Sequence, residues 1–204
     1  FRQGRRRFAR AVEILEASEE RVTPACPHAD SCTGCDLLHV SEREETTYGQ
    51  QTISEVLARY GETTVAPGAV DAIGEPARGD HRARAAYTLV VDDHGVRLGL
   101  RGWGGAIVSI PDCPASTPAV REAAAWVAEA ARGGGDRRTR VELTEGRDAD
   151  GHPAVAVVVD DDADWLRRED APACVAAVGV RAGDEVSLGD GCWPRQIAVG
   201  GVQL

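Results

Sequence analysis

The stretch CPHADSCTGC (residues 26–35) places three cysteines close together in a chain of 204 residues that contains six. Its spacing is C-x5-C-x2-C, so that Cys32 and Cys35 can turn both sulfurs toward one centre. Gly34 has no side chain to block a tight bend and leaves its amide free to approach a sulfur. The stretch therefore predicts a metal centre bound by cysteine, which the rest of the fold has to complete.

A tetrahedral, cysteine-only centre needs a fourth ligand. The best candidate is Cys113 in the segment IPDCP (residues 110–114), far away in the sequence. Cys113 is followed by proline, as Cys26 is, and as the isolated ligand of bacterial ferredoxins is. The predicted metal ligands are Cys26, Cys32, Cys35 and Cys113.

Three kinds of site remain open for these four thiols. Three clustered cysteines and one remote cysteine favour an iron–sulfur cluster. Zinc sites more often contain two C-x2-4-C pairs, although His28 or His39 can replace a sulfur. The thiols can also be simple core residues. Of the other two cysteines, Cys174 lies in an apolar run, and Cys192 is the substitute ligand if Cys113 is not one.

Five segments occur in an order that resembles a known family. They are RVTPACPH (21–28), CTGCDLLH (32–39), RAR (82–84), LGLR (98–101) and IPDCP (110–114). The chain resembles the cluster-containing RNA (uracil-5-)-methyltransferases, of the type that modifies 23S ribosomal RNA. Two positions depart from the family: Thr33 stands where glycine is usual, and Leu38 where glutamine is usual.

The resemblance implies a [4Fe–4S] cluster on the four cysteines, with a structural and RNA-positioning role. It also implies S-adenosylmethionine as the methyl donor and RNA, ribosomal by the type of family, as the partner. In the family a cysteine thiolate adds to C6 of uracil, and this nucleophile lies in a catalytic domain that we expect to be missing here. We therefore assign no catalytic residue. The alternative is a free-standing iron–sulfur or zinc module for electron transfer or scaffolding.

The overall charge does not favour an RNA-binding protein, because 33 acidic residues outnumber 23 basic ones. Phosphate contact, however, needs only one basic face. The predicted RNA-binding residues are Arg82 and Arg84, beside the metal centre, and Arg5, Arg6 and Arg7. Since the chain contains no lysine, arginine is its default base everywhere, and these residues can also be ordinary surface arginines.

The pattern of apolar residues predicts an α+β fold with a mainly antiparallel sheet and helices on one side. The expected strands are Tyr87–Val91, Val96–Leu100, Ala106–Ile110, Val141–Thr144, Ala154–Val159 and Cys174–Val180. Helices are expected after Ser41, which begins a capping box with Glu44, and after Thr117. A further short helix is expected at Asp164–Arg168.

The resemblance divides the chain into four parts. Residues 1–25 are the end of an OB-like RNA-binding barrel, with Ala9–Leu15 as its last strand, although periodicity alone indicates a helix there. Residues 26–43 and 78–188 form the iron–sulfur central domain. The helix at 44–61 packs on the catalytic domain, and residues 189–204 lead into it. With no apolar run of 18 residues, we expect a soluble, cytoplasmic protein. We also expect it to be a monomer.

Overall fold

The computed structural model describes residues 2–3, 6–7, 11–61, 63–66, 79–160, 162–188, 198–199 and 202–203. The chain divides into two compact units. The first contains Phe1–Ala25 and Leu37–Asp71, and the second contains Cys26–Asp36 and Ala72–Leu204. The cysteine stretch therefore belongs to the same unit as the sheet that follows it, although a long helix of the first unit lies between them in the sequence.

The first unit is built around helix α1 (Glu42–Tyr60). Its N-cap is Ser41, whose side-chain oxygen accepts a hydrogen bond from the amide of Glu44, as the capping box predicts. The Ser41 hydroxyl donates to the Glu20 carboxylate, and its amide donates to the Glu20 carbonyl. The helix ends at Gly61, whose amide donates to the carbonyl of Leu57.

The strand expected at Ala9–Leu15 is not formed over its described residues 11–15. Val12 is 98% exposed and Leu15 89% exposed, so neither side chain is buried in a barrel. A strand gains stability only when its backbone groups pair with a neighbour, and none of the described residues pairs with this segment. The described part of residues 1–25 has only the short antiparallel pair β1 (Arg2–Gln3) and β2 (Arg6–Arg7).

The second unit contains a seven-stranded sheet of order β5-β4-β3-β6-β7-β8-β9. All neighbouring strands are antiparallel except β7 and β8, which are parallel. The mainly antiparallel α+β fold predicted from the sequence is confirmed. The strand bounds are Arg84–Asp92 (β3), Gly95–Arg101 (β4), Ile107–Ser109 (β5), Arg137–Arg147 (β6), Pro153–Asp160 (β7), Val175–Ala182 (β8) and Glu185–Leu188 (β9).

The hairpin of β3 and β4 forms where the sequence predicts it. Asp92 pairs with Gly95 across the turn, and Gly95 has a φ of 99°, which only glycine adopts without strain. In β3 every second residue is buried, the pattern of a strand with one face on the core. In β7 all residues from Ala154 to Val159 are buried, as the continuous apolar run predicts.

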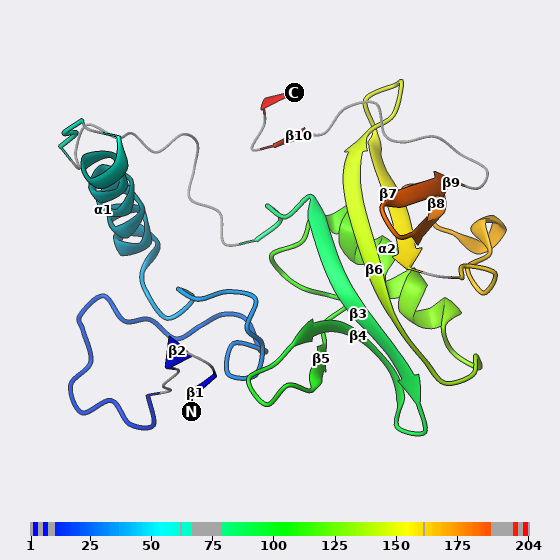
Figure 1. Cartoon of the computed structure of the whole chain (residues 1–204), viewed down its shortest axis with the longest axis horizontal. Coiled ribbons are helices and arrows are strands. Elements are labelled where there is room, and N and C mark those ends of the chain that lie inside the picture. Colours follow the sequence, from blue (N-terminus) through cyan, green and yellow to red (C-terminus); the bar gives the residue numbers. More distant parts are fainter. Residues whose placement is uncertain are drawn as a thin grey trace. The chain divides into compact units, whose positions relative to one another are not determined.

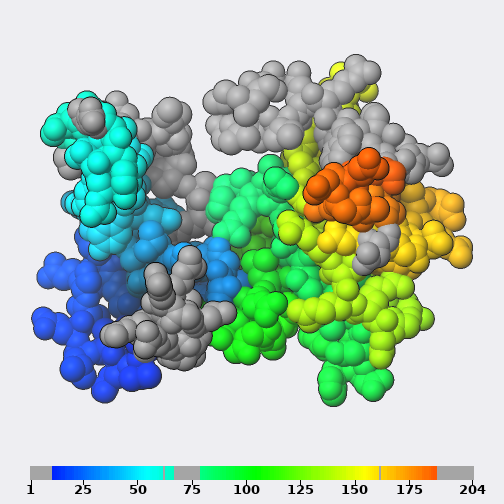
Figure 2. All heavy atoms as spheres, in the orientation of Figure 1, coloured from blue at the N-terminus to red at the C-terminus, as the bar shows by residue number. Residues whose placement is uncertain are grey.

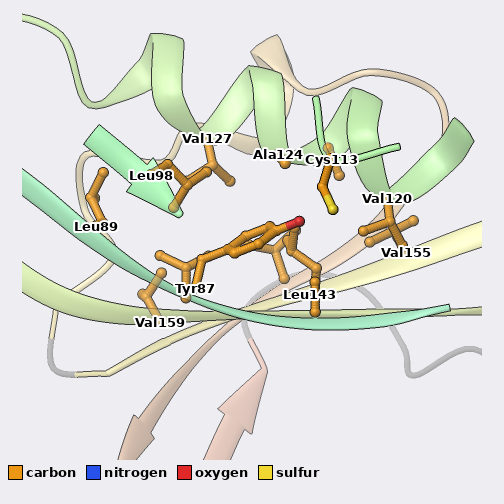
Figure 3. Close-up of a cluster of buried hydrophobic side chains, with 14 of the residues drawn as sticks. Tyr87, Leu89, Leu98, Cys113, Val120, Ala124, Val127, Leu143, Val155 and Val159 are labelled. Atoms are coloured by element: carbon orange, nitrogen blue, oxygen red, sulfur yellow. The ribbon is translucent and has the colours of Figure 1, made fainter. Parts of the chain in front are cut away.

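Helix α2 (Pro118–Ala130) crosses one face of this sheet, behind the strands in the view of Figure 1. Thr117 is its N-cap and accepts a hydrogen bond from the amide of Val120. The side chains that the helical pattern predicts to be buried are indeed buried: Val120, Ala124, Val127 and Ala131. They pack on Tyr87, Leu89, Leu143 and Val155 from the sheet (Figure 3). Figure 2 shows all heavy atoms in the same orientation, with the described residues coloured along the sequence.

The remaining elements are short. The short helix expected at Asp164–Arg168 is not formed; a 3₁₀ turn, η2 (Arg168–Asp170), lies at the end of that segment. The antiparallel pair of β10 (Ala198–Val199) and β11 (Val202–Gln203) is the described part of residues 189–204. Neither α1 nor α2 has the length and apolar character to cross a membrane, among the residues that the structure describes.

Candidate metal centre

The cysteine stretch is folded by its own backbone into consecutive turns. The Ala29 amide donates to the carbonyl of Cys26, and the Cys32 amide donates to the carbonyl of His28 at 2.8 Å. The Gly34 amide then points at the sulfur of Cys32, with an N···S distance of 3.3 Å. This is the contact that the absence of a side chain at Gly34 was expected to allow.

The loop is held against the end of strand β4. Cys32 forms an isolated antiparallel bridge with Gly102, and the amide of Trp103 donates to the carbonyl of Ser31. The Thr33 hydroxyl donates to the carbonyl of Arg101 at 2.6 Å. Thr33, which departs from the family pattern, therefore contributes a hydrogen bond that glycine could not make.

Cys113 is close enough to Cys35 to act on its pKa, although it comes from a distant part of the sequence. It lies in a turn after β5, in which its amide donates to the carbonyl of Ile110 and its carbonyl accepts from Ser116. The side chain is 9% exposed. In Figure 3 its sulfur and the Tyr87 hydroxyl lie on the same side of the core. The turn after β5 thus places Cys113 in the same unit as the clustered cysteines, and its role as the fourth ligand stays a prediction.

Arg82 connects the two cysteine-bearing segments. Its guanidinium donates to the carbonyl of Gly34 at 2.5 Å and to the sulfur of Cys35 at 3.4 Å. Its backbone amide donates to the carbonyl of Ala115, and its carbonyl accepts from Thr117, directly after Cys113. Sequence reasoning missed this role, because nothing local distinguishes an arginine that holds a loop from one that faces solvent.

The four thiols are electrostatic neighbours. Burial raises the pKa of the Cys35 thiol, and the Arg82 guanidinium opposes this shift. The thiols of Cys113, Cys32 and Cys26 raise the pKa of Cys35 further. Each of the other three cysteines is therefore close enough to act on Cys35, as the prediction of a single centre requires.

Four cysteine sulfurs can bind either a single zinc ion or an iron–sulfur cluster. A tetrahedral zinc ion with Zn–S bonds of about 2.3 Å holds its sulfurs about 3.8 Å apart. Among the described residues, no three cysteine sulfurs lie within 4.8 Å of one another. The four cysteine donors and the Gly34 amide directed at the sulfur of Cys32 would suit an iron–sulfur cluster.

The described residues contain one group whose possible ligand atoms do lie within 4.8 Å: Asp148, Asp150 and His152. It lies in the exposed turn between β6 and β7. The Asp148 carboxylate accepts hydrogen bonds from the amides of Asp150 and His152. The His152 amide is the main cause of the lowered pKa of Asp148. These hydrogen bonds within the turn explain why the three side chains lie close together.

Of the other two cysteines, the structure describes Cys174. Cys174 is half-buried, and its thiol donates to the carbonyl of Ala119. Burial, with Glu122 adding to the effect, raises the pKa of Cys174 to about 12, so that it stays a protonated thiol. Cys192 lies outside the described residues.

The arginines predicted to bind RNA differ in their surroundings. Arg82 is engaged with the cysteine loop, whereas Arg84 is 68% exposed and pairs with Glu142. Arg5 lies outside the described residues, and only the backbone of Arg6 and Arg7 is described, in β2. Their contact with RNA stays a prediction.

Curated proteins similar to this chain are RNA uracil-C5 methyltransferases, which confirms the resemblance predicted from the motifs. One is the 23S rRNA (uracil(1939)-C(5))-methyltransferase RlmD of Halomonas elongata, 38% identical over 120 residues, or 57% of this chain and 24% of that protein. RlmD of Stenotrophomonas maltophilia is 45% identical over 62 residues, or 30% of this chain and 14% of that protein. The first match spans about a quarter of its relative's length.

Among solved structures, the chain is similar to a tRNA (uracil-54, C5)-methyltransferase of Pyrococcus abyssi in complex with S-adenosyl-L-homocysteine. The TM-score is 0.55 with 18% sequence identity, over 94% of this chain and 46% of that one. At this identity the likeness supports the fold alone. No protein-family model matches the chain.

Proposed function

We propose that this chain is the RNA-recognition and iron–sulfur portion of an S-adenosylmethionine-dependent RNA uracil-C5 methyltransferase that acts on 23S ribosomal RNA. The observation that supports the proposal is the placement of Cys26, Cys32, Cys35 and Cys113 in one unit, where the other three thiols act on the pKa of Cys35. The names of the curated relatives supply the reaction and the RNA. Action on ribosomal RNA implies a cytoplasmic protein, and we expect it to be a monomer.

The four cysteines would hold a [4Fe–4S] cluster, which when bound supplies iron–sulfur bonds between the loop and the end of β5. This chain's own residues contribute the positioning. The Arg82 guanidinium holds the loop carbonyl of Gly34 and the sulfur of Cys35, while its backbone holds the segment that carries Cys113. We assign the cluster a structural and RNA-positioning role, because methyl transfer to uracil moves no net electrons.

We propose that methyl transfer itself belongs to a catalytic domain in a part of the enzyme that this chain does not contain, where S-adenosylmethionine binds. Helix α1 would pack on that domain. In support, its apolar side chains are open to solvent among the described residues: Ile53 is 46% exposed, Val56 49% and Tyr60 75%. Residues 1–25 would be the end of an RNA-binding barrel, and residues 189–204 the lead-in to the catalytic domain.

The ligand assignment is tested by single cysteine replacements in protein purified without oxygen. Cys32→Ser and Cys113→Ser should each lose most of the bound iron, because each removes one of four bonds. Cys174→Ser is the matched control and should retain the iron, since its thiol lies apart from the centre. Full iron retention in Cys113→Ser would contradict the assignment of the fourth ligand.

The reaction is tested on the longer protein that contains this chain. Incubation with labelled S-adenosylmethionine and a 23S rRNA fragment containing uracil 1939 should label C5 of a uracil. Label on no nucleotide, in protein that retains its cluster, would refute the methyltransferase proposal and favour a free-standing iron–sulfur module.

A further inference from the structure

Strand register gathers four arginines on the sheet face that is turned away from α2. Tyr87, Leu89 and Val141 point toward α2, and successive side chains of a strand point to opposite faces. The alternate residues of β3, β6 and β8 therefore lie on the far face, which is turned to the viewer in Figure 1. We call this set the arginine face: Arg84, Arg138, Arg140 and Arg181.

A buried carboxylate stands at the centre of the arginine face. Glu142 in β6 has a side chain only 6% exposed and forms ion pairs with three arginines. Arg84 reaches it from β3, and Arg181 from β8 at 2.5 Å. The guanidinium of Arg140 lies 3.8 Å away, on the same strand. A single carboxylate therefore fixes guanidinium groups from three strands.

The arginines keep free donors and a surplus of positive charge. Arg84 is 68% exposed and Arg140 is 51% exposed, and each guanidinium has five N–H donors, of which one carboxylate can take only a few. Arg138 is exposed and forms no ion pair with any residue that the structure describes. Against the four arginines stand two carboxylates, Glu142 and Asp160, which pairs with Arg181.

Among the described residues, the neighbouring parts of this face add no compensating charge. Farther along it, Arg97 and Asp92 pair with each other at 2.5 Å. The small apolar residues of β7 on this face, Ala156 and Val158, are buried. The side chains that the structure describes as accessible on this face are therefore mainly basic, although the whole chain has a net charge of -10.

We propose that the arginine face binds the phosphate backbone of the RNA substrate. A guanidinium is planar and bidentate, which suits it to phosphate oxygens. Phosphate contacts fix the orientation of a nucleic acid without reading its sequence. The arginine face would thus orient the RNA relative to the metal centre, which lies where β3 begins. This inference rests on the proposed function, but it can fail by itself.

The test is RNA affinity as a function of salt, measured on this chain with its cluster and a 23S rRNA fragment that contains uracil 1939. The test variant is Arg84→Ala/Arg140→Ala. The control is Arg167→Ala/Arg168→Ala, which removes two exposed arginines near η2, away from the arginine face. Loss of two phosphate contacts to single-stranded RNA should lower the slope of log affinity against log salt by about 1.4, or about 25-fold in affinity at 0.1 M salt.

The expected result is a reduced slope for the Arg84/Arg140 variant and an unchanged slope for the control. Equal losses in both variants would overturn the proposal, because they would reflect total charge rather than this face. An unchanged slope in both would overturn it too, while RNA binding by the wild-type chain would leave the proposed function standing. If the wild-type chain retains its iron but binds no RNA, the arginine face is refuted and the cluster assignment survives. Iron content, measured on the same samples, separates these outcomes.

Discussion

Replacement of Gly102 by alanine should detach the cysteine loop from the sheet. Gly102 bridges Cys32 at the end of β4. A Cβ atom there would lie 2.6 Å from the carbonyl oxygen of Ser31 and 2.8 Å from Cγ2 of Val108. Ordinary van der Waals contact begins at 3.4 Å, so the loop backbone would have to move by about 0.8 Å. The obstacle is a backbone atom, which cannot turn aside as the end of a side chain can.

Overpacking of this kind costs about 1–3 kcal/mol. With a urea dependence of about 2 kcal/mol per molar, the midpoint of unfolding should fall by about 0.5–1.5 M. Iron retention should fall as well, because the loop carries three of the four proposed ligands. The assay is urea unfolding of the protein with its cluster, followed by circular dichroism, with iron measured on the same preparation.

Gly104→Ala is the matched control, because a Cβ at Gly104 meets nothing within 4 Å and lies in the same turn. Its midpoint should be unchanged or slightly higher, since alanine reduces the entropy of the unfolded chain. If Gly102→Ala unfolds at the same urea concentration as Gly104→Ala and keeps the same iron, the docking of the loop on β4 is not what positions the cysteines.

Three further predictions concern single side chains of the second unit. Arg82→Gln should speed the loss of iron in air, because two hydrogen bonds to the loop disappear; a rate equal to that of wild type would refute the bridging role. Thr117→Ala should lower the free energy of unfolding by about 0.5–2 kcal/mol through loss of the α2 N-cap, measured by urea unfolding, and an unchanged midpoint would contradict this. Burial raises the pKa of Cys174 from 9.0 to about 12, so the unfolded chain loses this proton first. The free energy of unfolding should then decline between about pH 9 and 12, and a decline that is just as steep in Cys174→Ala would exclude this thiol as its source.

Local signals in the sequence were sufficient to predict most of the strands and the helix of the second unit. The turn before Gly95 predicted the hairpin of β3 and β4, and Thr117 with Pro118 predicted the start of α2. Both depend on residues adjacent in the sequence, where backbone preferences and hydrogen-bonding side chains act directly. The motif spacing likewise predicted that Cys113 would return to the cysteine loop.

The features that could not be predicted from the sequence depend on strand register and on neighbours that are distant in the sequence. Arg82 and Arg84 are two residues apart, yet one guanidinium holds the cysteine loop and the other pairs with Glu142 on the face away from α2. The difference arises because Arg82 precedes the regular strand, so strand alternation does not apply to it. The prediction of a barrel strand at Ala9–Leu15 was wrong for a similar reason. Val12 and Leu15 have an apolar pattern, but they have no strand to pair with among the described residues.

The most direct test of the central claim is the iron, sulfide and zinc content of the chain purified without oxygen, together with its visible spectrum. We predict about four irons and four sulfides per chain and a broad absorption near roughly 400 nm, as expected for a [4Fe–4S] cluster on four thiolates. A colourless, folded protein with one zinc ion would contradict the cluster. A folded protein with no metal would contradict the metal centre itself.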